Sequence, residues 1–115
     1  MDKRIDTLPE DIANCPIYKT MELFQGKWTV WVLFELNKNG TIRFGDLRKA
    51  IPNISNTMLA STLKDLEERG LVERIQYNEI PPRVEYTATE KAKDLQTVFE
   101  AMAVWGQKHG NNNGG

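Results

Sequence analysis

Cys15 is the residue of this chain whose type and position best suit covalent chemistry. It is the single cysteine, and it is followed by Pro16, which favours the first position of a helix, so Cys15 is expected at the helix N-cap. Backbone N–H groups and the helix dipole favour the thiolate there, and the thiolate is the reactive form of cysteine. Two interpretations stay open: a reactive thiol, or a small and partly buried cap residue.

Other patterns that would indicate an enzyme or a metal site are lacking in the sequence. One cysteine rules out an intrachain disulfide framework and is too few for a structural zinc site. His109 is the one histidine and stands near the chain end, no nucleophile lies in a recognisable motif, and no glycine-rich phosphate loop occurs. We therefore expect no enzymatic activity, no metal and no cofactor, and we interpret His109 as an exposed helix-end residue.

A second group of polar side chains lies in the stretch ISNTMLASTLKDLEERG, residues 54–70. Ser55 is a good N-cap and Gly70 suits the left-handed residue that follows a helix, so we predict a helix between them. One face of this helix carries apolar residues at helical spacing, namely Leu59, Leu63 and Leu66. The opposite face carries small or polar residues, namely Thr57, Ala60, Ser61 and Lys64. Such a polar face can approach a hydrogen-bonding, negatively charged partner such as a DNA major groove, although an ordinary solvated face is the alternative.

The segments on either side of this helix predict how it is positioned. Upstream, residues 44–51 form a short helix in which Phe44, Leu47 and Ile51 face one way, and the turn 52–54 joins the two helices. Downstream, strands at 71–77 and 83–87 flank the loop Asn78-Glu-Ile-Pro-Pro82, and residues 41–43 can add a very short third strand. Helix, turn, helix and hairpin in this order indicate a winged helix.

The remaining segments predict a mainly α member of the α+β class, a winged helix-turn-helix with extra N- and C-terminal helices. Residues 28–36 are apolar almost all round and should form the buried central helix, closed by a turn at 37–40. Thr89 should cap one last helix that runs past Trp105. We expect an N-terminal arm at 1–14, a single domain at 15–109 and a flexible tail at 110–115.

The two terminal helices carry more large apolar side chains than a winged-helix core needs. A larger monomer core is one explanation, and a dimer interface is the other. We favour the homodimer because two-fold proteins that read paired half-sites are the usual geometry of this motif. The expected interface consists of Ile17, Met21, Phe24, Phe99, Met102 and Trp105.

Composition limits the compartment and the partners. No apolar run approaches the roughly 20 residues that span a bilayer, and no signal peptide is evident, so we expect a soluble, cytoplasmic protein without membrane contact. The net charge of −1 argues mildly against nucleic acid, for which a basic domain is typical. Only local clustering, by Arg43, Arg48, Lys49 and Lys64, can support a DNA interface.

Taken in order, several short motifs resemble the HxlR family of bacterial transcription regulators. They are Cys15-Pro16, Gln25-Gly-Lys-Trp-Thr29, Arg43-Phe-Gly-Asp-Leu47, Ile54-Ser55, Met58-Leu59, Leu66-Glu67, Gly70-Leu-Val72 and Pro81-Pro-Arg-Val-Glu-Tyr86. The resemblance implies a dimeric winged helix that binds double-stranded operator DNA, related in architecture to MarR regulators. It also implies that Cys15 can be a sensor thiol, since members with a cysteine there include sensors of quinones, aldehydes and disulfide stress.

Within the DNA hypothesis the side chains take different roles. Asn56, Thr57 and Ser61 suit base-edge contact, whereas Lys64, Lys49 and Arg43 suit phosphates. Arg83 suits a minor-groove or backbone contact by the wing, or alternatively an ion pair with Glu79 or Glu85. The full set of expected DNA contacts is Arg43, Lys49, Ser55, Asn56, Thr57, Ser61, Lys64 and Arg83. The alternative function is a winged-helix protein-interaction module without specific DNA binding, and the sequence identifies no effector.

Overall fold

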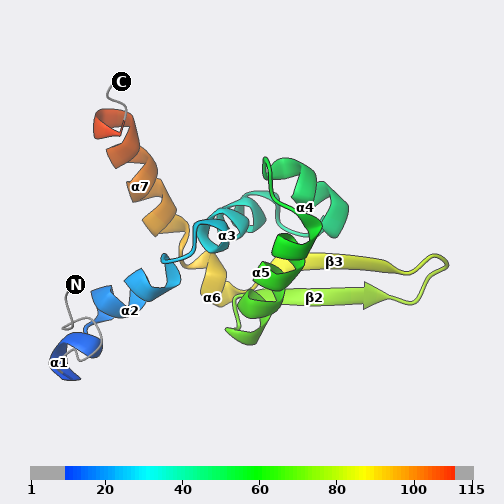
Figure 1. The fold of residues 1–115 in the computed structure, drawn as a ribbon, viewed down its shortest axis with the longest axis horizontal. Helices are drawn as coiled ribbons and strands as arrows, with labels where there is room; N and C mark the ends of the chain where they lie inside the picture. Colours follow the sequence, from blue (N-terminus) through cyan, green and yellow to red (C-terminus); the bar gives the residue numbers. More distant parts are fainter. Residues whose placement is uncertain (1–9, 111–115) are drawn as a thin grey trace.

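The computed structural model describes residues 10–110, so most of the expected arm at 1–14 and all but the first residue of the expected tail at 110–115 lie outside the described residues. Ten elements follow one another along the described chain (Figure 1). They are α1 (Glu10–Ala13), α2 (Pro16–Leu23), α3 (Lys27–Asn39), β1 (Ile42–Arg43), α4 (Phe44–Ala50), α5 (Asn56–Glu68), β2 (Val72–Tyr77), β3 (Arg83–Ala88), α6 (Glu90–Lys93) and α7 (Gln96–His109).

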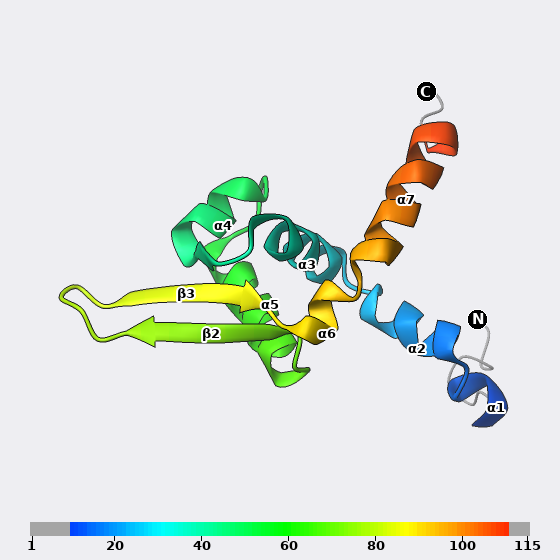
Figure 2. The same ribbon diagram turned by 180° about the vertical axis from the view of Figure 1, so that it is seen from behind.

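The winged helix predicted from the sequence is confirmed. Helices α3, α4 and α5 pack beside a three-stranded antiparallel sheet of order β1-β3-β2, and the β2–β3 hairpin extends beyond them as the wing (Figures 1 and 2). Ile42 of β1 pairs with Tyr86, and β2 pairs with β3 from Val72 opposite Ala88 to Tyr77 opposite Arg83. The very short strand expected at 41–43 is therefore present and closes one edge of the sheet.

The core lies between α3, α5 and the sheet. Its largest fully buried side chains are Val32, Leu33, Leu36, Leu47, Ile51, Leu59, Leu63 and Leu66. Residues 28–36 do lie in the central helix, as expected, and Val32, Leu33 and Leu36 are fully buried, but Phe34 remains 39% exposed. The predicted turn at 37–40 is shorter than expected, since α3 continues through Asn39 and ends at Gly40, whose φ of 76° requires a residue without a Cβ.

Both predicted ends of α5 are confirmed by hydrogen bonds. At the start, the Ser55 hydroxyl accepts the Met58 N–H at 3.0 Å. At the end, Gly70 has a φ of 78°, the Leu71 N–H donates to the Leu66 carbonyl at 2.9 Å, and the Gly70 N–H donates to the Glu67 carbonyl at 3.0 Å. These two bonds form a Schellman motif, which sets the direction in which the chain enters β2.

The prediction of one last helix is wrong, because α6 and α7 are separate helices. The Ala92 carbonyl accepts the Leu95 N–H and the side-chain amide of Asn37, each at 3.0 Å. Both lone pairs of this carbonyl oxygen are thereby used. In a continuous helix the same oxygen would accept the Gln96 N–H, but here it has no lone pair left to do so. Thr89 does cap, as expected, but it caps α6 through the Ala92 N–H.

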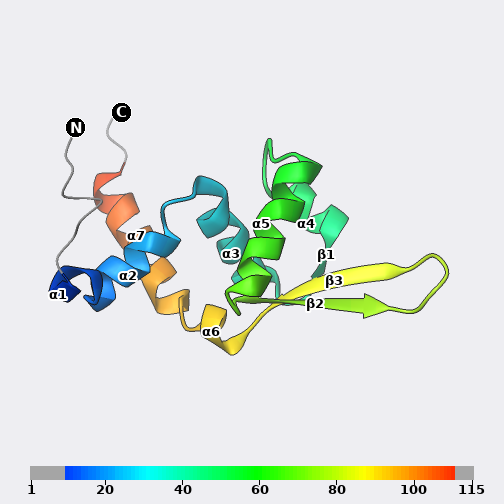
Figure 3. The same ribbon diagram turned by 60° about the horizontal axis from the view of Figure 1, so that its bottom comes forward.

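Helices α2 and α7 extend away from the winged-helix body, on the side opposite the wing (Figure 3). No residue of α2 is buried, and Phe99 is the single buried residue of α7. Among residues 10–110, none of the helices combines the length and the apolar character needed to cross a bilayer.

Candidate nucleic-acid interface

The outer face of α5 presents the polar side chains that the sequence singled out. Asn56, Thr57, Ser61 and Lys64 are all exposed, while Leu59, Leu63 and Leu66 on the opposite face are buried in the core. Ser55 is engaged as the helix cap, so its hydroxyl already has a partner within the chain. This arrangement leaves a firmly packed helix whose free face carries hydrogen-bonding groups and one cation.

The wing positions Arg83 beside its loop, but the arginine is not free. Its guanidinium lies 3.2 Å from the Glu79 carboxylate and 3.4 Å from that of Glu85. It also stacks over the ring of Tyr77, its cross-strand neighbour, with 4.1 Å between the guanidinium carbon and the ring centroid. The ion pairs left open by the sequence are therefore both present. Tyr77 was not predicted as a neighbour of Arg83, although its place opposite Arg83 follows once the hairpin register is known.

Arg43 and Arg83 converge on one acid. Arg43 lies directly opposite Glu85 in the β1–β3 pairing, and its Nε atom is 3.9 Å from the same Glu85 oxygen that faces Arg83. The side chain of Arg43 is nevertheless mostly exposed. The contact of Glu85 with Arg43 was not expected, because the two residues lie far apart in the sequence and meet only when β1 joins the sheet.

The remaining predicted cation, Lys49, comes from the first helix of the helix-turn-helix. It lies exposed in the last turn of α4, beside the equally exposed Arg48. Basic residues at a helix C-terminus also complement the helix dipole, which provides a purely structural reason for their position. The predicted DNA contacts thus come from β1, α4, α5 and the wing.

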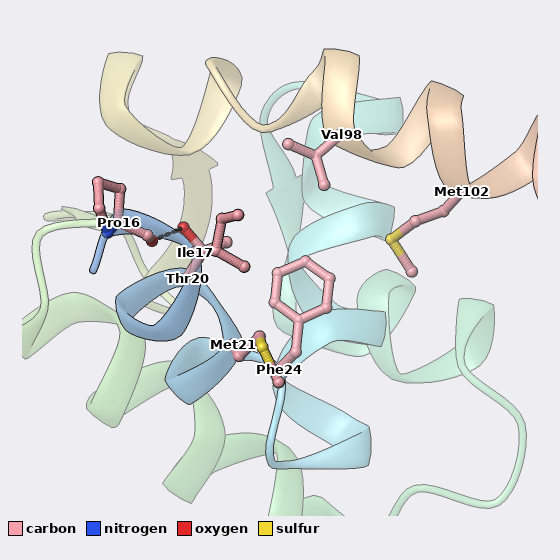
Figure 4. Close-up of a pocket in the computed structure, with 7 residues that line it drawn as sticks. All are labelled: Pro16, Ile17, Thr20, Met21, Phe24, Val98 and Met102. Atoms are coloured by element: carbon pink, nitrogen blue, oxygen red, sulfur yellow. Dashed lines mark hydrogen bonds between the residues drawn. The ribbon is translucent and has the colours of Figure 1, made fainter. Parts of the chain in front are cut away.

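Cys15 occupies the predicted N-cap of α2. The residue is partly buried, and its side chain makes no capping hydrogen bond. Pro16, which follows it, lines an apolar cavity of about 480 Å³ between α2 and α7, together with Ile17, Thr20, Met21, Phe24, Val98 and Met102 (Figure 4). The Thr20 hydroxyl donates to the Pro16 carbonyl at 2.9 Å, so the cavity wall is apolar in character.

The residues expected at a dimer interface fall into two groups. Four are strongly exposed: Ile17 (70%), Met21 (58%), Met102 (46%) and Trp105 (63%). The other two lie deeper, since Phe24 is half-buried and Phe99 is only 6% exposed. Phe99 packs within its own chain, with ring centroids 6.4 Å from Phe24 and 5.8 Å from Phe34. Phe99 was expected at the dimer interface, but it is buried within its own chain, where it anchors α7 on α3.

The pattern of the HxlR-like helix-turn-helix family matches residues 23–113. The chain belongs to this family. An uncharacterised HTH-type transcriptional regulator of Methanothermobacter thermautotrophicus is similar, with 38% identity over 107 residues, which cover 93% of this chain and 81% of the relative.

Solved structures of other regulators resemble this HxlR-like protein. A Porphyromonas gingivalis W83 protein assigned to the MarR family of transcriptional regulators superposes with a TM-score of 0.78 and 41% identity, over 84% of this chain and 93% of that one. The redox regulator HypR in its oxidised form gives a TM-score of 0.73 and 33% identity, over 86% and 99% of the two chains. Fold and sequence thus agree on a winged helix-turn-helix of the HxlR and MarR-like type.

Proposed function

We propose that this protein regulates transcription by binding a (pseudo)palindromic DNA operator as a homodimer, with α5 in the major groove and the wing against the neighbouring backbone or minor groove. The observation that carries the proposal is the outer face of α5, where Asn56, Thr57, Ser61 and Lys64 are exposed on a helix whose other face is buried. Membership of a helix-turn-helix family supports the same interface. Asparagine pairs well with the edge of adenine, and lysine meets phosphates.

The cations around α5 support a phosphate contact in spite of the net charge of −1. Lys49 and Lys64 are exposed on the two helices of the motif, and Arg43 is exposed at the edge of the sheet. A protein needs positive charge only where it meets the backbone, so a local cluster can supply the electrostatic part of the affinity. Arg83 contributes when phosphate replaces one of its two acidic partners.

Dimer formation is supported by the apolar surface of α2 and α7. Ile17, Met21, Met102 and Trp105 are large, exposed and carried by the two helices that leave the winged-helix body. Monomeric proteins seldom expose such groups together, and a two-fold assembly would cover them while placing two α5 helices on successive half-sites. Light scattering should give the mass of two chains at micromolar concentration, and a stable monomer would contradict this part of the proposal.

A redox function of Cys15 is a second candidate, favoured by the similarity to the redox regulator HypR. Cys15 is the N-cap residue of α2, and this helix carries part of the proposed dimer surface. With one cysteine per chain, diamide can oxidise two thiols only into a disulfide between chains or with a small thiol, and is itself reduced to the hydrazine. Either product would displace α2 and alter the spacing of the two α5 helices.

The test of operator binding is fluorescence anisotropy with labelled DNA from the intergenic region beside the gene, compared with a scrambled duplex across a salt series. We expect tight binding to the first duplex, weaker binding to the second, and a steep loss of affinity with salt for both. Weak binding that ignores sequence, in reduced and oxidised protein alike, would instead favour a protein-interaction module.

The test of the thiol uses the same titration before and after diamide or a quinone, with Cys15→Ser as the matched variant. The parent should lose or gain operator affinity on treatment, and Cys15→Ser should respond to neither reagent. Equal responses of the two proteins would remove the redox function and leave the operator-binding proposal intact.

A further inference from the structure

A small apolar tip lies at the far end of the wing, in the loop of residues 78–82 that joins β2 to β3 and is called the wing loop below (Figures 1 and 3). Ile80 of this loop is the most exposed large apolar residue in the part of the chain that the structure describes. Pro81 and Pro82, which follow it, are exposed as well. One exposed apolar residue is ordinary on a protein surface, but three in succession on a projecting loop form a surface that a partner can cover.

The wing loop is held in one shape by contacts at its base. The Glu79 N–H donates to the Tyr77 carbonyl at 2.9 Å, and the Glu79 carboxylate lies 3.2 Å from the Arg83 guanidinium. Arg83 in turn stacks on the ring of Tyr77. The two prolines fix two further backbone angles. A loop that is already ordered loses little conformational freedom when a partner surrounds it, so its apolar contacts add more to affinity.

The tip of the wing presents no cation to DNA. The wing loop contains no lysine or arginine, and its one acid, Glu79, is paired with Arg83 at the start of β3. The other polar residue of the loop is Asn78, which is neutral and exposed. A wing of this composition meets DNA with a neutral tip, so it gains more from a groove floor than from a phosphate.

A hollow separates the wing loop from the start of α4. Its volume is about 460 Å³, and it is lined by Arg43, Phe44 and Gly45 on one side and by residues 79–84 on the other. In the proposed complex one DNA strand passes between α5 in the major groove and the wing in the neighbouring groove. The lining offers that strand two guanidinium groups for a phosphate and an aromatic ring for a deoxyribose. A strand in this hollow would leave Ile80 on its far side, at the minor groove.

We propose that Ile80 enters the minor groove as an apolar wedge and makes the wing prefer base pairs that lack an amino group there. Isoleucine and proline are among the side chains with which DNA-binding proteins enter this groove. The N2 amino group of guanine projects from the groove floor and would meet Ile80, which cannot accept its hydrogen bond. An A·T pair leaves that space free, and the Asn78 amide can donate to its acceptors. This specificity rests on the proposed function, because it needs the wing to lie on DNA.

The first experiment changes the minor groove and leaves the pattern of the major groove intact. The scrambled duplex is compared with the same duplex in which inosine replaces every guanosine, because inosine lacks the N2 amino group and keeps the major-groove acceptors of guanine. In anisotropy titrations at fixed salt we expect the protein to bind the inosine duplex about fivefold more tightly.

Variants assign this preference to one side chain. Ile80→Ala should remove most of the preference and weaken binding to the inosine duplex about fivefold, since the shorter side chain leaves the groove floor unfilled. The slope of log affinity against log salt should stay the same, because an apolar contact releases no counterions. Ile80→Val keeps a branched apolar group and should keep the preference. Lys64→Ala is the matched control, which should lose affinity for both duplexes, flatten the salt slope and keep the preference.

The outcomes separate the wedge from the proposed function. Equal affinity of the parent for the two duplexes, or a preference that survives in Ile80→Ala, would overturn the wedge. If such a protein still prefers operator to scrambled DNA, the proposed function stands without it. If the inosine preference depends on Ile80 but no specific operator binding is found, the wedge stands and the proposed operator binding fails. A protein that binds no duplex would remove both.

Discussion

The Nε atom of Arg83 lies 3.4 Å from a carboxylate oxygen of Glu85, two residues further along the same strand. The same oxygen is 3.9 Å from the Nε atom of Arg43 on the neighbouring strand. One largely buried acid therefore serves two arginines that we propose as DNA contacts. A phosphate that approaches either arginine must compete with this carboxylate, so Glu85 opposes the binding that its neighbours promote.

Glu85→Gln should strengthen DNA binding. The amide keeps the size and shape of the carboxylate but removes the negative charge, so we expect affinity for any duplex to rise about threefold at low salt. Anisotropy titrations across a salt series measure this, and the salt dependence should become steeper as more arginine charge is available. Glu100→Gln on α7 is the control for the change in net charge alone. Weaker binding in Glu85→Gln would mean that the acid positions the arginines and does not compete for them.

Lys64→Ala should weaken binding to operator and scrambled DNA by the same factor. The ammonium group is exposed on the outer face of α5, where it suits a phosphate and carries no sequence information. The slope of log affinity against log salt should become shallower by about one unit. Lys108→Ala, far from α5 in the last turn of α7, should leave both affinity and slope unchanged.

Asn56→Ala should instead reduce the preference for operator. Its amide stands exposed in the first turn of α5, and loss of a bidentate contact with adenine typically costs about 1–3 kcal/mol of discrimination. Affinity for the scrambled duplex and the salt slope should stay close to those of the parent, in contrast to Lys64→Ala. A variant that retains its full preference for operator would show that α5 meets DNA through another face.

Ser55→Ala should lower the free energy of unfolding without changing the packing of the core. The hydroxyl accepts the Met58 N–H at 3.0 Å, and removal of such a cap costs about 1 kcal/mol. We expect the midpoint of thermal unfolding to fall by about 4 °C, measured by circular dichroism at one fixed protein concentration. Ser61→Ala, on the exposed face of the same helix, serves as the control and should unfold at the midpoint of the parent or slightly above it, because alanine favours a helix interior. Equal midpoints for Ser55→Ala and the parent would show that the cap adds no stability.

Met21→Lys should dissociate the proposed dimer. Its side chain is mostly exposed in the subunit, so a lysine fits the monomer, but it would bury a charge in the interface. We expect the dimer dissociation constant to rise at least about tenfold, as measured by light scattering over a dilution series. Ile80→Lys at the wing tip makes the same change on a fully exposed residue and should leave the mass unchanged. A dimer that tolerates Met21→Lys would place the interface elsewhere.

The features predicted correctly from the sequence are those that depend on neighbouring residues. Ser55 and Gly70 mark the ends of α5 because a cap hydroxyl and a left-handed glycine act within one helical turn. The hairpin follows in the same way from two strand-like runs around a proline-containing loop, and Cys15-Pro16 marks the start of α2. Local hydrogen bonding and periodicity carry this information, so the winged helix and the polar face of α5 could be predicted without coordinates.

Other features depend on contacts between distant residues, and only the tertiary structure decided them. The break between α6 and α7 follows from the Asn37 amide reaching the Ala92 carbonyl, which lies 55 residues away. Phe99 is buried by Phe24 and Phe34, and Glu85 meets Arg43 only because β1 joins the sheet. Periodicity indicates which face of a helix is apolar, but the choice of neighbour for each face is made by the fold.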